Sequence, residues 1–325
     1  MTEFSIIKRF CQGIGKQHSQ TTIGVGDDAA VINIPPNKEL AISTDTMVEG
    51  VHFFPGTKPE LIAHKLLAVN LSDMAAMGAE PKWATMTMTL PTADDVWLKK
   101  FSRTLHEQAL HYGVQLIGGD TTQGNLNLSI NIIGLLPTGK ALTRRQAEPG
   151  HDVYVSNTLG DAALALRAIE GNVSINDGDL VLLKKALDSP IPQVDLGKEL
   201  LPIASACLDV SDGLLADLKH VCEQSSVSMS LDVSKVPVSK IYQKYLNNKE
   251  ITLDLAINGG DDYQLAFTAD TQYRDDMQVL ANKLSTPLVR IGKVVKQSTK
   301  AIQLFINEKP YSLKNRNDGY EHFNT

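Results

Sequence analysis

The sequence predicts an α+β N-terminal domain with a mixed sheet, followed by an α/β C-terminal domain. In the first 140 residues, strand-like and helix-like segments follow one another in an irregular order, which is typical of α+β folds. From residue 150 onward, short apolar strands alternate with amphipathic helical segments, as expected where helices pack on a sheet. The stretch between them is turn-rich and basic, and Pro149-Gly150 precedes a new apolar run. We therefore expect domains at 1–140 and 150–325.

Hydrophobic periodicity and turn residues place the elements of the first half. The expected helices cover residues 4–11, 58–77 and 93–112. The expected strands cover residues 29–34, 40–44, 83–90, 114–117 and 126–136. Glycines and polar residues predict a loop after the first helix, ending near Thr22.

The second half is divided by the same criteria. Its expected strands cover residues 153–156, 206–210, 228–233, 263–268, 288–291 and 301–305. Its expected helices begin at Asp161 and cover residues 180–187, 195–204, 214–223 and 274–284.

Composition excludes several classes of protein. A net charge of −6 and a pI near 5.8 argue against general nucleic-acid binding, because no basic surface is implied. The three cysteines, Cys11, Cys207 and Cys222, are too scattered for a disulfide framework or a CxxC metal site. No apolar run approaches the ~18 residues of a membrane span. We expect a cytoplasmic protein with no nucleic-acid and no membrane partner.

Aspartates beside glycine, serine or threonine recur where short apolar runs end. They are Asp27, Asp28, Asp45, Asp73, Asp120, Asp209 and Asp212. Such carboxylates can converge on one cleft, but they repel one another unless cations lie between them. Carboxylate and hydroxyl oxygens are hard donors that favour Mg²⁺. The pattern therefore predicts a site for several Mg²⁺ ions.

The first acidic segment, residues 24–29, also matches the dinucleotide-binding pattern GxGxxG/A. That pattern requires a helix directly after the glycines, whereas residues 30–34 are β-rich and lead into two prolines. Two aspartates in the loop would also repel a pyrophosphate. We interpret the segment as a cation-binding loop, with a plain acidic turn as the alternative.

Three more features of the first half are ambiguous when each is taken alone. Ser43, Thr44 and Asp45 close an apolar strand and offer hard oxygen ligands, although a helix cap or Asx turn would use the same residues. Asp73 lies among small and apolar helix neighbours, which predicts a partly buried carboxylate with either a cation or a capping hydrogen bond. His52 suits a structural role as well as a functional one.

Glycine-led acidic turns follow the same logic later in the chain. Residues 117–122 end a buried strand with two glycines, a carboxylate and two hydroxyls, which suits a nucleotide or metal turn or a simple tight turn. Residues 258–265 form either a substrate-facing turn or a hairpin. Arg144 and Arg145 are suited to phosphate contact, although arginines in linkers are commonly only solvated.

The segment 208–214 is the most specific of these motifs. Ser211 is a plausible helix N-cap, and Asp212 would interact favourably with the helix dipole. That structural interpretation leaves Asp209, at the end of the preceding strand, without a role.

Taken together, these motifs resemble a known family. The segments GDDAAV, STDTMVEGVHF, NLSDMAAMGAEPKWA, GGDTT, LTRR, LDVSDGLLADL, GGDDYQLAF and GYEHF occur in order over nearly the whole chain. They resemble the thiamine-monophosphate kinase family of the aminoimidazole ribonucleotide synthetase superfamily. The resemblance implies an aminoimidazole ribonucleotide synthetase-like two-domain architecture, an N-terminal domain that forms a homodimer, and a C-terminal domain that closes the active-site cleft. It implies ATP-dependent phosphorylation of thiamine monophosphate to thiamine diphosphate.

The resemblance also implies roles for individual residues. The metal ligands would be Asp28, Ser43, Thr44, Asp45, Asp73, Asp120, Asp209 and Asp212, with Asp27 adjacent. Nucleotide contacts would come from Gly119, Asp120, Arg144 and Ser211. Substrate contacts would come from His52, Asp261 and Tyr320, where Asp261 replaces the family's glutamate and Tyr320 replaces its tryptophan.

The expected chemistry is direct in-line transfer of the γ-phosphoryl group. A substrate phosphate is already anionic near neutral pH, so positioning and charge neutralisation replace a strong general base. Asp45, Asp73, Asp120 and Asp212 are the expected catalytic carboxylates, acting through Mg²⁺. No GxxxxGK[ST] loop is present, which excludes a P-loop kinase.

Other interpretations belong to the same superfamily or to another class. A ligase that makes a purine intermediate remains an alternative. Selenophosphate synthetase would carry a reactive Cys or selenocysteine before Gly24, and a hydrogenase-maturation relative would end in cysteine. A non-catalytic cation-binding scaffold would show DxDxDG spacing, which is absent.

Overall fold

The computed structural model describes residues 2–313, so Tyr320 lies outside the described residues. The chain divides into two compact units. Unit 1 comprises Met1–Met74 and Ala79–Ala141, and unit 2 comprises Ala75–Gly78 and Leu142–Thr325. Within the described part, no helix is both long enough and apolar enough to cross a membrane.

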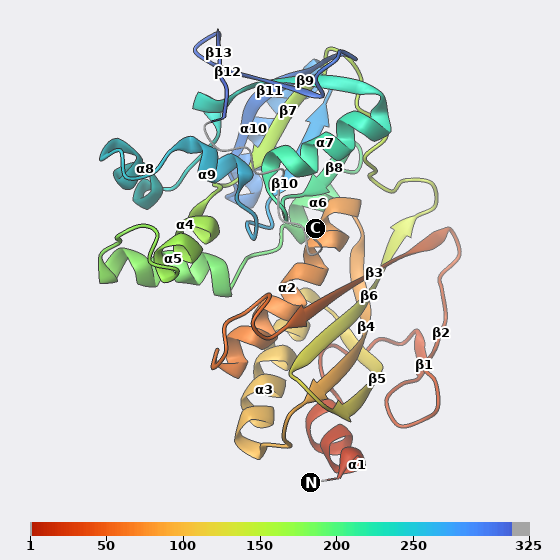
Figure 1. The fold of residues 1–325 in the computed structure, drawn as a ribbon. Coiled ribbons are helices and arrows are strands. Elements are labelled where there is room, and N and C mark those ends of the chain that lie inside the picture. Colours follow the sequence, from red (N-terminus) through yellow and green to blue (C-terminus); the bar gives the residue numbers. More distant parts are fainter. Residues whose placement is uncertain (1, 314–325) are drawn as a thin grey trace. The chain divides into compact units, whose positions relative to one another are not determined.

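Unit 1 is built on a four-stranded mixed sheet with strand order β3-β6-β4-β5 (Figure 1). Only β4 and β5 pair in parallel, and the other two pairs are antiparallel. The strands of unit 1 are β1 Thr21–Ile23, β2 Val31–Ile32, β3 Lys38–Val48, β4 Glu80–Leu90, β5 Gln115–Gln123 and β6 Asn127–Pro137. Its helical segments are α1 Glu3–Ile6, the π-helical turn η1 Ile7–Cys11, α2 Pro59–Met77 and α3 Asp95–Tyr112.

The helices α2 and α3 lie along one face of this sheet (Figure 1). Leu98, Phe101 and Leu105 of α3 are buried at the helical spacing that marks an amphipathic helix. Asp94 caps the start of α3 by accepting hydrogen bonds from the amides of Val96 and Trp97. The apolar face of α3 therefore covers one face of the sheet and holds it in place.

Two strands of unit 1 continue beyond their expected ends. One strand is expected to end at Thr44, but β3 runs to Val48 because every residue from Lys38 to Val48 pairs with β6. Another is expected to end at Ile117, but β5 runs to Gln123 beside its parallel partner β4. A strand whose neighbour continues keeps its hydrogen bonds even through glycines and polar residues. The residues 43–45 and 118–122 therefore lie inside strands.

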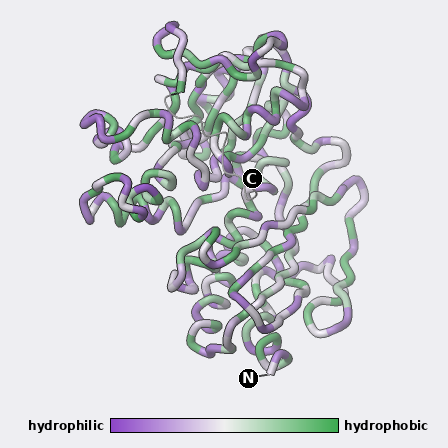
Figure 2. The backbone as a smooth tube through the Cα atoms, viewed as in Figure 1, coloured by the Kyte–Doolittle hydropathy of each residue, from purple (hydrophilic) through white to green (hydrophobic). Residues whose placement is uncertain are grey.

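Unit 2 contains a seven-stranded sheet with strand order β13-β12-β9-β11-β7-β10-β8. Its strands are β7 Asp152–Ser156, β8 Ala204–Asp209, β9 Val227–Asp232, β10 Leu265–Ala269, β11 Leu288–Lys296, β12 Ile302–Ile306 and β13 Lys309–Pro310. Its helices are α4 Asp161–Ile169, α5 Asp177–Asp188, α6 Val194–Leu200, α7 Leu214–Ser225, α8 Lys240–Asn247, α9 Leu253–Asn258 and α10 Arg274–Leu284, with 3₁₀ turns η2 Val233–Lys235 and η3 Thr271–Tyr273. In Figure 2, hydrophilic residues mark outward turns such as the one between β12 and β13.

Alternate residues of β7 pack on the two opposite faces of this sheet. Val153 and Val155 are fully buried in a core that also holds residues of α7. Tyr154, between them, stacks on Phe267 at a ring-centroid distance of 5.4 Å. Alternate residues of a strand point to opposite faces, so both faces of unit 2 are covered.

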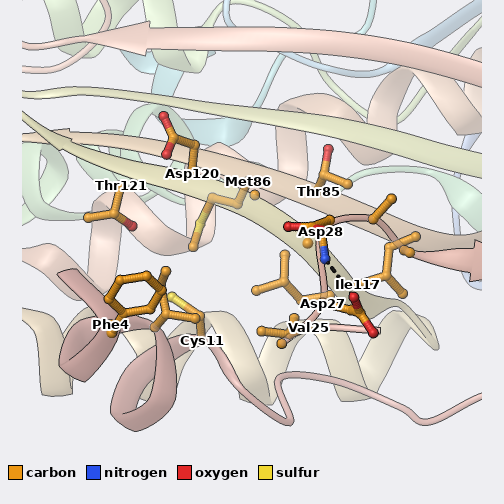
Figure 3. A pocket seen from close by; sticks show the side chains of 17 residues that line it. Phe4, Cys11, Val25, Asp27, Asp28, Thr85, Met86, Ile117, Asp120 and Thr121 are labelled. Carbon is orange, nitrogen blue, oxygen red and sulfur yellow. Dashed lines mark hydrogen bonds between the residues drawn. The ribbon is translucent and has the colours of Figure 1, made fainter. Parts of the chain in front are cut away.

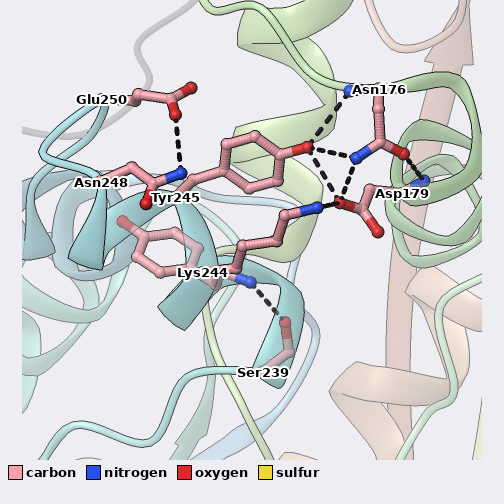
Figure 4. A network of polar contacts seen from close by, with 8 residues as sticks. Asn176, Asp179, Ser239, Lys244, Tyr245, Asn248 and Glu250 are labelled. Carbon is pink, nitrogen blue, oxygen red and sulfur yellow. Dashed lines mark hydrogen bonds and ion pairs between the residues drawn. The ribbon is translucent and has the colours of Figure 1, made fainter.

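The helices α8 and α9 are not predicted by sequence periodicity. The helix expected at 195–204 ends earlier, at Leu200. A small core and a polar network hold α8 against α5 (Figure 4). The Tyr245 hydroxyl donates to Asp179 Oδ2 at 2.9 Å, and Lys244 Nζ contacts the same oxygen at 2.7 Å. Such tertiary contacts stabilise short helices whose local sequence signal is weak.

Candidate active site

A pocket of about 480 Å³ in unit 1 is lined by two of the expected motifs (Figure 3). Asp27 and Asp28 come from the loop before β2, and Asp120 comes from β5. Phe4 and Cys11 of the N-terminal helical segment close another side. The pocket therefore brings acidic oxygens together with an apolar wall, a combination that suits a charged ligand with an aromatic or aliphatic part.

The acidic loop has an internal hydrogen bond. Asp27 Oδ1 accepts from the backbone amide of Asp28 at 2.9 Å, as a short acidic turn would. The loop leads into β2 without forming a helix, which removes the structural basis for a dinucleotide fingerprint. Both aspartates are exposed to solvent, where charged ligands can reach them.

The pocket floor depends on glycine at one position. Gly119 has φ +151°, and a Cβ there would lie 1.8 Å from the carbonyl oxygen of Met86 on β4. Gly118, its neighbour, would place a Cβ in ordinary contact with Thr85, 3.7 Å from Cγ2. Gly119 therefore lets β5 approach β4 closely, whereas Gly118 leaves space.

A second acidic group of unit 1 lies between β3 and α2. Ser43 Oγ donates to Asp73 Oδ2 at 2.5 Å, and the backbone amide of Asp45 donates to Asn70 Oδ1 at 3.1 Å. Asp73 is partly buried, as its apolar neighbours predict. Because side chains alternate along a strand, Ser43 and Asp45 share the face toward α2.

The alternation separates Thr44 from the other two residues. Thr44 is exposed on the opposite face of β3, where its Oγ1 accepts from Asn131 Nδ2 at 2.7 Å. From the sequence, residues 43–45 are expected to be one set of ligands at a strand end. Inside a strand, three consecutive residues cannot present their side chains to a single ion.

His52 lies in the turn after β3. Its Nδ1 accepts a hydrogen bond from the Val48 amide at 3.0 Å, which leaves Nε2 as the nitrogen that carries the proton in the neutral ring. The buried Lys65 of α2 contacts the His52 carbonyl at 3.4 Å. The first contact orients the imidazole ring, and the second holds the backbone of His52.

In unit 2, the segment 209–213 connects β8 to α7. Asp209 is buried at the end of β8, and Ser211 and Asp212 are partly exposed. Gly213 is the N-cap of α7 and offers no side chain, so the expectation that Ser211 caps this helix is wrong. Asp217 accepts hydrogen bonds at Oδ2 from the amides of residues 211–213 instead.

Asp217 is 4% exposed, and burial raises its pKa to about 7. The negative charge of Asp212 acts in the same direction, while the backbone hydrogen bonds oppose it. No sequence signal distinguished Asp217 from the acidic residues that are common in the first turn of a helix.

The glycine-led turn 259–263 is built on this segment. The Asp261 amide donates to the Ser211 carbonyl at 2.8 Å, and the Tyr263 amide donates to the Val210 carbonyl at 2.8 Å. Asp261 itself has φ +66° and accepts a hydrogen bond from the Tyr263 hydroxyl at 2.9 Å. The structure thus brings two expected motifs of unit 2 together.

The neighbouring Asp262 has a structural role that its sequence context does not indicate. Both of its carboxylate oxygens accept from the Gly160 amide at 3.0 Å, at the start of α4. Burial raises the pKa of Asp262 well above its ordinary value, and the charges of Asp161 and Asp261 act in the same direction. Asp262 therefore anchors the turn to α4.

Arg144, an expected nucleotide contact, is exposed in unit 2, and its carbonyl accepts from Ser225 Oγ at 2.8 Å. Among residues 2–313, no three His, Cys, Asp or Glu side chains form a group that could hold a metal ion by themselves. Within unit 1, the expected ligands fall into two groups. One is Asp28 and Asp120 at the pocket, and the other is Ser43, Asp45 and Asp73 beside α2.

Comparisons with known proteins identify the family. Residues 26–136 match the model of the AIR synthase related protein, N-terminal domain. The thiamine-monophosphate kinase of Haemophilus influenzae is 39% identical over 325 residues, covering 99% of this chain and 98% of the relative.

Two solved structures agree with this assignment. The crystal structure of thiamine-monophosphate kinase from Stenotrophomonas maltophilia is similar with a TM-score of 0.83 and 38% identity, covering 95% of this chain and 96% of that one. A ThiL structure complexed with AMPPCP and TMP has a TM-score of 0.77 and 27% identity, covering 90% and 89%. These likenesses confirm the expected fold and the resemblance. The chain belongs to the thiamine-monophosphate kinase family.

Proposed function

We propose that this protein transfers the γ-phosphoryl group of ATP, in the presence of Mg²⁺, directly to the phosphate of thiamine monophosphate. The single observation that carries the proposal is the pocket of unit 1, where Asp28 and Asp120 meet an apolar wall. The family relationship and the solved relative complexed with AMPPCP and TMP support ATP and thiamine monophosphate as the substrates. ADP and thiamine diphosphate are the products.

The donor set of unit 1 fits Mg²⁺. It consists of carboxylate and hydroxyl oxygens, the hard ligands that this ion prefers. Mg²⁺ is usually held by one or two carboxylates together with water and substrate phosphates, so a site of this kind does not need three protein carboxylates in contact. We assign Asp28 and Asp120 to one such site and Asp45 and Asp73 to another. Ser43, which contacts Asp73, is proposed as a further oxygen ligand of that site, whereas the Thr44 side chain lies on the opposite face of β3 and is not part of it.

The remaining expected residues among those described come from both units. Asp209 and Asp212 are proposed metal ligands, and Ser211 and Arg144 are proposed nucleotide contacts, as is Gly119 in unit 1. His52 and Asp261 are proposed to contact thiamine monophosphate. When bound, Mg²⁺ would neutralise charge on the transferring phosphates.

The protein's own residues then need only to bind and orient the two substrates. A phosphate oxygen of thiamine monophosphate forms the new bond to the γ-phosphorus while the bond to the β-phosphate oxygen breaks and ADP leaves. That oxygen is anionic near neutral pH, so no side chain needs to remove a proton. The polar backbone of residues 118–120 and the carboxylates orient the groups.

The test measures ADP and thiamine diphosphate with ATP, Mg²⁺ and thiamine monophosphate. We expect both products in equal amounts, and none after chelation of Mg²⁺. Thiamine and aminoimidazole precursors serve as control acceptors. ADP release with thiamine in place of its monophosphate would overturn the substrate assignment.

We further propose that unit 1 forms a homodimer through the outer face of its sheet. Ile42 of β3 is 59% exposed on the face opposite α2, beside the exposed Thr44 and Thr46. An open sheet face with exposed apolar residues is typical of an interface. Light scattering should show a dimer that becomes monomeric in Ile42→Glu. The control Val279→Glu changes a similarly exposed apolar residue of α10 and should remain dimeric.

The chain's three cysteines are buried and unpaired, which is compatible with a reducing compartment. We therefore propose that the enzyme works in the cytoplasm.

A further inference from the structure

The carboxylate of Asp217 binds three consecutive backbone amides. Its Oδ2 accepts from Ser211 at 3.1 Å and from Asp212 and Gly213 at 3.2 Å each. The residue lies in the first turn of α7 and is 4% exposed. A carboxylate that accepts several N–H groups holds a turn more firmly than a neutral acceptor does.

The N-cap residue of α7 supplies no side-chain hydrogen bond to this helix start. Gly213 is the N-cap, with φ +122°, and a Cβ there would lie 2.6 Å from the Asn258 carbonyl oxygen. The turn is therefore confined between α7 and the end of α9. Asp217 is the side chain that satisfies its amide donors.

The turn of residues 259–263 packs directly against the turn of residues 211–213. The Ser211 carbonyl accepts the Asp261 amide at 2.8 Å. A Cβ on Gly260 would lie 2.2 Å from the same carbonyl oxygen, so the two backbones are in close contact. A shift of residues 211–213 would consequently move the turn that carries Asp261.

We propose that Asp217 is a positioning residue. It holds the turn of residues 211–213 in place and, through that turn, fixes the position of the turn of residues 259–263. The inference rests on the proposed function in that Asp212 serves the metal and Asp261 serves the substrate. It predicts that both kinds of binding change together when Asp217 is altered. A helix-stabilising acid without a positioning role would affect stability alone.

The first experiment does not depend on activity. Hydrogen exchange is measured by mass spectrometry on full-length Asp217→Asn and on the parent protein. Asn is nearly isosteric but offers a neutral acceptor oxygen, so exchange should be faster in peptides covering both 210–213 and 259–263. The matched control is Asp254→Asn, which alters a buried carboxylate of α9 that accepts from Tyr311. Faster exchange at 210–213 alone would overturn the coupling.

The second experiment measures ligand binding. In Asp217→Ala, Mn²⁺ affinity measured by electron paramagnetic resonance should fall about tenfold, as is typical when a residue that orients a metal ligand is lost. The KM for thiamine monophosphate should rise by a similar factor, and Asp217→Asn should restore part of both losses. If Asp217→Ala does not fold, the same two quantities in Asp217→Asn decide.

The outcomes separate the two proposals. Unchanged Mn²⁺ affinity and KM in a variant that is merely less stable would show that Asp217 has only a structural role. If the parent protein does not phosphorylate thiamine monophosphate, the proposed function fails. The exchange experiment then still tests whether Asp217 couples the two turns.

Discussion

Ser43 and Asp73 are joined by a 2.5 Å hydrogen bond that links the middle of β3 to α2. The bond brings a hydroxyl and a carboxylate from segments 30 residues apart onto one face of the sheet. Asn70, one turn earlier on α2, binds the Asp45 amide at 3.1 Å. The helix therefore orients the strand at two successive inward positions.

We expect Asp73→Asn to reduce kcat at least about 100-fold, because a neutral amide cannot replace the carboxylate that we propose as a metal ligand. The fold should persist, since the Asn oxygen can still accept from Ser43. ADP release at saturating Mg²⁺ and the thermal midpoint are the measurements. Glu107→Gln, an exposed change on α3, is the control. Near-normal turnover of Asp73→Asn would contradict the assigned role.

The neighbouring glycines Gly118 and Gly119 provide a matched pair of substitutions. Gly119→Ala would force its Cβ against the Met86 carbonyl and should destabilise the protein by more than about 2 kcal/mol. Gly118→Ala meets only ordinary contacts and should change stability by less than about 1 kcal/mol. Urea unfolding measures both, and equal losses for the two variants would contradict the close-approach argument.

The elements with strong local signals were predicted well from the sequence. The helix predicted at 58–77 is observed at Pro59–Met77, and the helix at 274–284 is observed with those bounds. Their apolar periodicity and terminal residues are local properties of the chain. By contrast, α8 depends on Asp179 of α5, a partner 65 residues away. Periodicity carries no information about such a partner.

The site was predicted less completely, for a related reason. Residue types identified Asp28 and Asp120, which line one pocket. The face on which Thr44 lies depends on whether β3 continues past it, and the pairing with β6 decides that. The contacts of Asp217 depend on the path of the turn before α7. Both are tertiary facts that residue spacing does not encode.

Because Asp152 forms ion pairs, we expect the protein to lose stability in acid. Burial raises the pKa of Asp152, but hydrogen bonds and charges of Arg274 and Arg290 outweigh this and hold the pKa below its ordinary value. The ion pairs therefore stabilise the fold fully above about pH 4 and progressively less as pH falls below it. Asp152→Asn should cost about 1–3 kcal/mol near pH 7, because charge-assisted hydrogen bonds are lost.

The measurement is urea unfolding of Asp152→Asn and the parent protein at pH 7 and near pH 3.5. The difference in unfolding free energy should be smaller at the lower pH. A difference that is constant with pH would show that the loss is one of packing rather than of ionic pairing.

Asp262 predicts the opposite pH dependence, because burial holds its pKa above the ordinary range. The folded state keeps the proton at pH values where the unfolded state, with a pKa of about 3.9, has released it. The parent protein should therefore lose stability as pH rises from about 4 toward the raised pKa. Asp262→Asn keeps an acceptor for the Gly160 amide and has no proton to lose, so this term disappears. Its stability relative to the parent should rise between pH 5 and pH 8 in urea unfolding.

Asp152→Asn is the control, because its pH window lies below about 4 and its difference from the parent should stay flat over that range. If the Asp262→Asn and parent curves run parallel from pH 5 to pH 8, the folded and unfolded states carry the same charge at residue 262 over that range, which would contradict the raised pKa of Asp262.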